Sequence, residues 1–280
     1  MDEVRSGVVT PAFPNNLSDL FREVVEVIAD PSCCCVWRGQ SNCSWKPYPG
    51  LYRRLLNNNY TEADIDERLV QRYEMDMFCE ANGLGFYGEA GGNRLGLMIN
   101  LQHAGGATRL LDVTWDPFVA LWFASHDTDN HAGIGIIYCY QIDPSCCPLP
   151  EQIDSWDDII SSNKRGQPVL ITPHRINERI KAQSASFLTS VLDGPISNGS
   201  AFSHTTAYSD VKPILLKPNL KKELRGWLAQ SRRVREFDLF PDFSGYAQAN
   251  SQRSQFARDP DFLYDGSDGL FPSKLGTRQN

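Results

Sequence analysis

The segment 117–125 constrains the fold most, because its helix would be apolar on every side. Asp116 and Pro117 form a typical helix start, with an aspartate N-cap and a proline in the first turn. The residues that follow, FVALWFAS, have no polar face, so this helix must be buried. Residues 135–142 (GIIYCYQI) and 212–216 indicate buried strands. We therefore expect an α+β fold with a mixed or split central β-sheet flanked by helices.

The remaining periodic segments favour further helices. Four are expected, at residues 15–29, 61–82, 93–103 and 219–229. Thr61 with Asp64 resembles a capping box, so the second of these is expected to begin at Thr61, and Gly83 fits its end. Residues 34–40 form a short β-rich run. Beyond about residue 250 the chain becomes polar and irregular, which predicts a loosely docked tail.

Length and composition favour a soluble protein with one main domain. The chain has 280 residues, of which 41% are hydrophobic, so a packed core is expected. It starts without the basic and apolar regions of an export signal, and no apolar run approaches the roughly 18 residues of a membrane helix. We expect a cytoplasmic location.

Charge and cysteine usage argue against two classes of site. The net charge of −7 does not suit a general nucleic-acid coat, although the basic residues between 221 and 235 are either a local patch or a solvated helix face. The eight cysteines include the adjacent groups 33–35 and 146–147, and no C-x-x-C pair occurs. Reduced thiols and no metal site are therefore expected.

The run Trp37-Arg38-Gly39-Gln40 is the first candidate site. It places an arginine at a strand end, beside a glycine that lets a backbone or a ligand approach closely. The five donors of an arginine suit a phosphate or a carboxylate. A buried ion pair with an acid such as Asp112 is an equal alternative.

The run 102–114 is denser in chemical groups. It holds an imidazole (His103), a guanidinium (Arg109), a carboxylate (Asp112) and a glycine pair whose turn can present backbone N–H groups to an anion. His103 could act as an acid, a base or a hydrogen-bond donor near neutral pH. In a β-like register Arg109 and Asp112 point to opposite sides. A wholly structural role for the run is the alternative.

A third polar segment spans residues 179–190. Arg179, Gln183 and the hydroxyl groups there could line a ligand cleft, although Ser184 and Ser186 could equally be turn residues. The motifs of P-loop NTPases, zincins and α/β-hydrolases are absent from the sequence, which argues against those classes. Residues 83–88 (GLGFYG) have the Gly-x-Gly-x-x-Gly spacing of Rossmann enzymes, but they follow an expected helix and not a strand, which argues against that class as well.

Together these segments resemble the FRG domain, named for a Phe/Tyr-Arg-Gly motif that stands here as Trp37-Arg38-Gly39. The resemblance continues at residues 45–53, 102–112, 117–124, 179–187 and 239–245. It implies an N-terminal helical extension at 1–30, an FRG domain at 31–250 and a polar C-terminal tail at 251–280.

The layout of the FRG domain is similar to the ADP-ribosyltransferase superfamily, and this similarity implies an ADP-ribosyltransferase-like fold and a site for NAD⁺. The implied catalytic residues are Arg38, His103, Arg109, Asp112 and Glu236. The implied NAD⁺-binding residues are Trp37, Arg38, Gly39, Gln40, Gln183, Phe187 and Thr189. The acid that stabilises the oxocarbenium-like centre would be Asp112, Glu236 or Asp242.

The expected function is NAD⁺-dependent ADP-ribosyl transfer to a macromolecule, RNA or DNA before protein, in a toxin or phage-defence effector. An antitoxin and a chaperone are expected partners, because such an activity would harm its host. Two alternatives stay open. One is a non-catalytic module that senses a nucleotide or another anion through Arg38, His103 and Arg109. The other is a metal-independent nuclease that uses His103 and Asp112.

Overall fold

The core of the protein is one six-stranded antiparallel sheet with the strand order β4-β5-β2-β1-β3-β6. The computed structural model describes residues 11–28, 34–86, 93–126, 133–142, 155–157, 159, 166, 168–173, 178–198, 209–232 and 234–249. The strands are β1 (Cys34–Gln40), β2 (Leu111–Thr114), β3 (Gly135–Ile142), β4 (Pro168–Ile171), β5 (Ala185–Ser190) and β6 (Ser209–Leu216). The α+β class is confirmed. A mixed sheet is wrong, since every pair of these strands is antiparallel.

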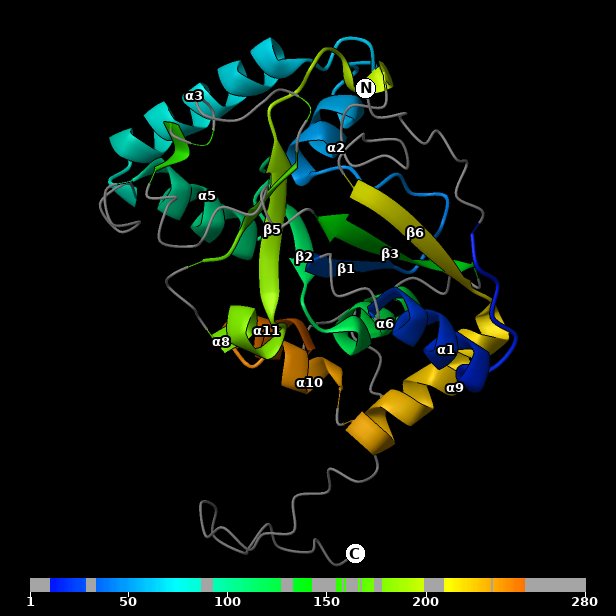
Figure 1. Ribbon diagram of the computed structural model, residues 1–280. Helices are drawn as coiled ribbons and strands as arrows, with labels where there is room; N and C mark the ends of the chain where they lie inside the picture. Colours follow the sequence, from blue (N-terminus) through cyan, green and yellow to red (C-terminus); the bar gives the residue numbers. More distant parts are fainter. Residues whose placement is uncertain are drawn as a thin grey trace, which may run out of the picture.

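The sheet has two halves that meet at a narrow junction. β1 pairs with β3 along its whole length, from Cys34 to Gln40, but it pairs with β2 only at Trp37 opposite Thr114. In Figure 1, β5 stands upright while β1, β3 and β6 run across the view. The sheet therefore bends between β4-β5-β2 and β1-β3-β6, and this bend lies beside Arg38.

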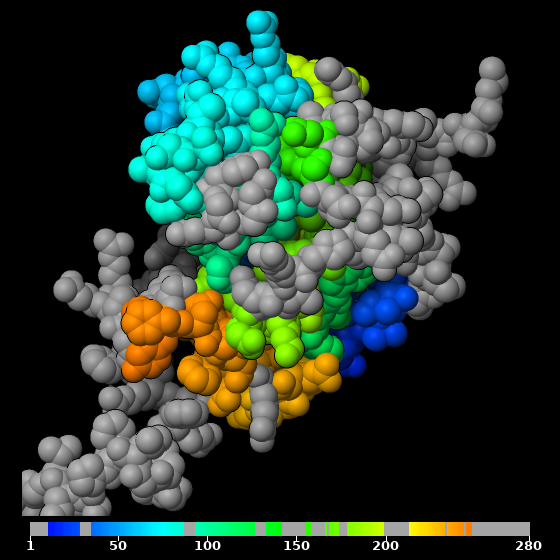
Figure 2. Space-filling model, turned by 90° about the vertical axis from the view of Figure 1, so that its left-hand side faces the viewer, coloured from blue at the N-terminus to red at the C-terminus, as the bar shows by residue number. Residues whose placement is uncertain are grey.

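Nine helices surround the sheet in the described part of the chain. They are α1 (Leu17–Ile28), α2 (Gly50–Asn57), α3 (Glu67–Gly83), α5 (Arg94–His103), α6 (Pro117–Ser125), α8 (Glu178–Ala182), α9 (Pro218–Trp227), α10 (Glu236–Leu239) and α11 (Phe243–Ala249). Figure 2 shows α8 in yellow-green next to α10 and α11 in orange, on one side of the molecule. Within the described ranges, no helix has the length and apolar character needed to cross a bilayer.

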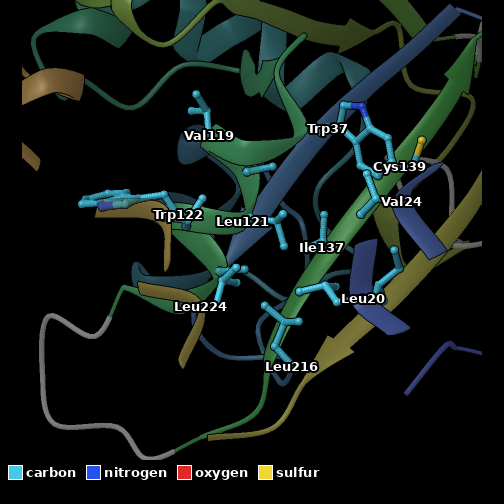
Figure 3. Packing of buried hydrophobic residues seen from close by; sticks show 14 of the residues in the cluster. Leu20, Val24, Trp37, Val119, Leu121, Trp122, Ile137, Cys139, Leu216 and Leu224 are labelled. Atoms are coloured by element: carbon cyan, nitrogen blue, oxygen red, sulfur yellow. The ribbon is translucent and has the colours of Figure 1, made fainter. Parts of the chain in front are cut away.

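α6 is the fully apolar helix expected from the sequence. The Asp116 carboxylate caps it by accepting a hydrogen bond from the Phe118 backbone N–H at 2.8 Å. The helix packs between β1 and α9, and Figure 3 shows Leu121 and Leu224 meeting the β3 side chain Ile137. The prediction of a buried helix here is confirmed. α1 packs into the same core, through side chains that include Leu20 and Val24.

Several helix boundaries differ from those expected. α3 begins at Glu67, because Asp66 caps it by accepting from the Leu69 N–H, whereas Thr61 and Asp64 close a separate turn. The predicted start at Thr61 is therefore wrong, while the end at Gly83 is confirmed. The expected tail at 251–280 lies outside the described residues.

Candidate functional site

Two cavities open side by side at the end of β1. Their volumes are about 620 and 680 Å³, and Arg38, Gly39, Phe123 and Phe240 line both. We call them the first and second lobes of one cleft. The first lobe is further lined by Trp45, Lys46, Tyr48, Arg53, Glu62 and Glu236. The second lobe is further lined by Gln102, His103, Asp112, Arg179, Gln183 and Phe187.

Gly39 is required by the packing of α6 on β1. A Cβ atom at this position would lie 1.8 Å from the carbonyl oxygen of Ala120 and 2.7 Å from the nitrogen of Ala124. No side chain fits there, since real Cβ atoms keep ordinary van der Waals distances from backbone atoms. The group that approaches Gly39 closely is therefore the backbone of α6 and not a ligand. This close packing places α6 beside Arg38.

Arg38 lies at the junction of the two lobes. Its Nη1 donates to the carbonyl oxygen of Asp112 at 2.7 Å, and its Nε donates to Oε1 of Gln40 at 3.2 Å. Gln40 is held in turn, because its Nε2 donates to the carbonyl oxygen of Trp45 at 2.9 Å. The Asp112 carboxylate lies 4.0 Å from Nη1 and is 58% exposed. Arg38 is therefore positioned by one backbone oxygen and by the Gln40 side chain, and the Asp112 carboxylate still faces the cleft.

A chain of hydrogen bonds orients Asp112. The Thr108 hydroxyl accepts from the Leu110 N–H and donates to Oε1 of Gln102 at 2.6 Å. Because that bond fixes the orientation of the Gln102 amide, its Nε2 is free to donate to Oδ2 of Asp112 at 2.8 Å. The carboxylate in the second lobe is thus held by a side chain whose own orientation is determined inside the protein.

Arg179 and Asp242 join the second lobe to α10 and α11. Their side chains form a two-bond ion pair, with distances of 2.7 and 2.9 Å. Asp242 also accepts from the Gly245 N–H, and Nε2 of His103 lies 3.9 Å from the same carboxylate. Burial, followed by the positive charge of Arg179, lowers the pKa of His103, so the imidazole is neutral at pH 7. Asp242 is occupied by this pairing, which disfavours it as the catalytic acid.

Arg109, which was predicted to be catalytic, lies outside both lobes of the cleft and apart from the other predicted catalytic residues. Its side chain is fully buried outside both lobes, with Nε 2.5 Å and Nη2 2.6 Å from the Glu74 carboxylate. Nη1 donates to Glu67 at 2.9 Å. This network attaches α3 to the chain that enters β2. Arg109 points away from Asp112, as the expected β-like register implied.

Two of the residues expected to bind NAD⁺ are also buried in the core. Trp37 borders the second lobe, but it is only 1% exposed and packs among side chains of α1 and β3, including Val24 and Cys139 (Figure 3), so its ring is covered by the core. Thr189 is 1% exposed within β5 and lines neither lobe. The other expected residues line the cleft, and Gln183 also donates to the Leu239 carbonyl oxygen at 3.0 Å.

The basic residues between 221 and 235, for which a local patch and a solvated helix face were both left open, do not all face solvent. Lys221 is 1% exposed, and its Nζ donates to the carbonyl oxygens of Ser41 and Gly133. Arg235 forms an ion pair with Asp238 at 2.8 Å. Conversely, the first lobe is lined by Trp45, Lys46 and Arg53, which were not among the predicted site residues. The available signal was their position in the stretch 45–53, which resembles the FRG domain.

The fold and the cleft define an α+β protein whose site is centred on an Arg-Gly pair at a strand end. Residues 34–133, the segment from β1 to just beyond α6, match the FRG domain. No curated protein and no solved structure matches the chain. Within the described residues, no three His, Cys, Asp or Glu side chains cluster as a metal site would require.

Proposed function

We propose that the cleft transfers ADP-ribose from NAD⁺ to a macromolecule. The observation that carries this proposal is the meeting of two lobes of similar volume at Arg38, with Phe123 and Phe240 as shared walls. A transferase needs adjoining sites for two substrates, so that the reacting atoms meet at the boundary. The two-lobed cleft supplies such a boundary.

The second lobe suits NAD⁺. Arg38 can direct its guanidinium N–H groups toward the diphosphate, since arginine binds phosphate oxygens in pairs. Phe187 and Gln183 line the same lobe and offer an apolar surface and an amide to the nicotinamide ribose. Among the described residues that line this lobe Asp112 is the one acid, and its side chain is 58% exposed, so we assign it the catalytic role in preference to Asp242 and Glu236.

The chemistry follows from these positions. The bond between C1′ of the ribose and the nicotinamide nitrogen breaks, and its electron pair leaves with nicotinamide, which becomes neutral. The Asp112 carboxylate stabilises the positive charge that develops at C1′. A nucleophile of the acceptor then forms a bond to C1′ from the first lobe and releases its proton to water. Gln102 holds the carboxylate in place during this step.

The biological setting is proposed from the resemblance to ADP-ribosyltransferase toxins. Modification of a macromolecule in the host would be harmful, which suits a toxin or phage-defence effector acting in the cytoplasm. An antitoxin, and a chaperone that delivers the chain to it, are the partners we propose. RNA or DNA is the preferred acceptor class.

The test is incubation of the purified chain with NAD⁺ labelled in its adenosine half, together with total RNA, DNA or cell lysate. We expect nicotinamide release and label on one fraction. Asp112→Asn should slow release by about 100-fold or more, because it removes a charge that stabilises the transition state. Arg38→Gln should mainly raise KM for NAD⁺, because it weakens diphosphate binding in both ground and transition states.

Matched controls lie on α3. Asp76→Asn and Arg72→Gln change exposed residues that line neither lobe, and both variants should keep full activity. A folded chain that releases no nicotinamide with any acceptor would overturn the transferase. If it binds NAD⁺ without turnover, it is the anion-sensing module. Degradation of nucleic acid without NAD⁺ would identify the nuclease instead.

A further inference from the structure

The first lobe contains a set of aromatic rings that the reaction itself does not need. Trp45 is 46% exposed at the lobe, and Tyr48 lies beneath its surface. Trp122 and His126 also line the lobe and are stacked, with ring centroids 4.2 Å apart and an interplanar angle of 18°. Flat aromatic walls of this kind suit a planar ring, because stacking on an aromatic side chain is favourable for every nucleobase.

The charged side chains that line the first lobe carry a net positive charge, whereas the whole chain is negative. Arg38, Lys46 and Arg53 line it against the two carboxylates Glu62 and Glu236, although the whole chain carries a net charge of −7. Lys46 pairs with Glu62 at 2.5 Å, but the lysine side chain is still 58% exposed, so a phosphate can compete for it. Partial burial and the nearby charge of Arg38 lower the pKa of Arg53, and an anion between these two arginines would relieve their repulsion.

Further aromatic side chains are exposed next to the lobe. α10 and α11 supply Phe240 and Gly245 to its wall, and the same helices expose Phe237, Phe243 and Tyr246 at 61%, 83% and 57%. These helices project from the surface in Figure 2. Exposed apolar side chains mark a binding surface where they gather in a patch, and bases that flank one held in the lobe could stack on these rings.

We propose that the first lobe binds one unpaired base of a single-stranded nucleic acid, with the adjoining phosphates at Lys46 and Arg53. This inference rests on the proposed function, for which it names the acceptor class. A base within a duplex is paired on one edge and stacked on both faces, so it cannot enter a recessed lobe lined by Trp45 and His126. A single strand can present a base that is turned outward.

The test measures binding in the absence of NAD⁺. Fluorescein-labelled eight-nucleotide single strands, oligo(A), oligo(U) and oligo(dA), are titrated with the full chain, alongside a blunt duplex of the same length. We expect single strands to bind and the duplex to bind at least about tenfold more weakly. With two or three cations at the lobe, log K against log salt should have a slope of about −2 or shallower.

The variants separate stacking from folding. Trp45→Ala should weaken binding about tenfold, and Trp45→Phe should retain most of the affinity, because a ring is preserved. Trp115→Ala is the matched control, since Trp115 is 41% exposed but lines neither lobe. Unfolding temperatures of the three variants that equal that of the unchanged protein would show that folding is unaffected.

Three results would overturn the inference: no binding of any single strand, equal binding of the duplex, or an unchanged affinity in Trp45→Ala. Label from NAD⁺ that appears only on protein would also overturn it, while the transferase itself would stand. Conversely, single-strand binding that depends on Trp45, without any nicotinamide release, would support the site and reject the transferase. The two proposals can therefore fail separately.

Discussion

At Gly39 the backbone of β1 leaves no space for a methyl group, because Ala120 of α6 would lie 1.8 Å from it. We expect Gly39→Ala to lower the free energy of unfolding by about 3 kcal/mol or more, since backbone atoms on both sides would have to separate. Urea denaturation measures this change. A loss below about 1 kcal/mol would show that α6 can move away from β1 at little cost.

Gly83 provides the matched control for that substitution. It ends α3, and a Cβ atom there would meet nothing within 4 Å. Gly83→Ala should leave the protein equally stable or stabilise it by up to about 1 kcal/mol, because alanine favours the helix and restricts the unfolded chain. A lower free energy of unfolding in Gly39→Ala, with an equal or higher one in Gly83→Ala, would show that close packing and not conformational freedom requires the glycine at position 39.

His103 should make stability depend on pH. Its pKa in the folded protein lies below the ordinary 6.5, owing to burial and then Arg179, while Asp242 opposes the shift. Between the lowered pKa and 6.5 the unfolded chain binds a proton that the folded chain does not. The free energy of unfolding should therefore fall as the pH drops from about 6.5 through that window.

His103→Gln isolates this contribution from the other histidines. Urea denaturation of both proteins between pH 8 and pH 5 should show a smaller fall in stability for the variant. A proton titration of His103 by NMR gives the same answer directly. If its pKa were above 6.5, the ion pair with Asp242 would dominate and the expected sign would be reversed.

Among single residues, the sequence identified those whose chemistry depends on a local pattern. Arg38 and Asp112 line the cleft as expected. Arg109 was grouped with these two residues in the predicted site, because its partners Glu67 and Glu74 lie on a helix that is distant in the sequence. A signal did exist: these two acids share the buried face of α3 with Val70 and Phe78, where an unpaired carboxylate would be costly.

At the scale of elements, the Arg109 network fastens α3 to the sheet. Arg109→Met should lower the free energy of unfolding by about 3–5 kcal/mol, because two buried carboxylates lose their only described cationic partner. Arg94→Met is the control, since Arg94 and its partner Asp157 are 32% and 71% exposed, and a loss under about 1 kcal/mol is expected there. Chemical denaturation compares the two. Similar losses would contradict a special role for burial.

Elements were predictable where one feature dominated their sequence. The apolar pattern of α6 and the strand pattern of β3 agree with the structure. The start of α3 was misplaced, because Thr61 with Asp64 and Asp66 with Leu69 both satisfy local capping chemistry, and only tertiary packing selects the second. β5 was missed, since a strand buried on both faces lacks the alternation of polar and apolar residues.

At the scale of the whole molecule, the cleft is assembled from segments that are distant in the sequence. β1, β2, α8 and α10 each contribute to it, and the pairing of Arg179 with Asp242 joins α8 to the connection between α10 and α11 across 63 positions. Nothing in a single sequence specifies which surfaces will meet in this way. The chemistry of the site could therefore be anticipated, but its division into two lobes could not.

The contacts of Lys221 have a consequence for where this protein can be divided. From α9 it binds the carbonyl oxygens of Ser41 and Gly133, which lie near the two ends of the segment that matches the FRG domain. A fragment 34–133 would lack α9 and so would lose both hydrogen bonds of Lys221. It would keep only the strands β1 and β2, which pair at a single residue position. The limits of the match therefore do not delimit an autonomous folding unit, which must extend through α9.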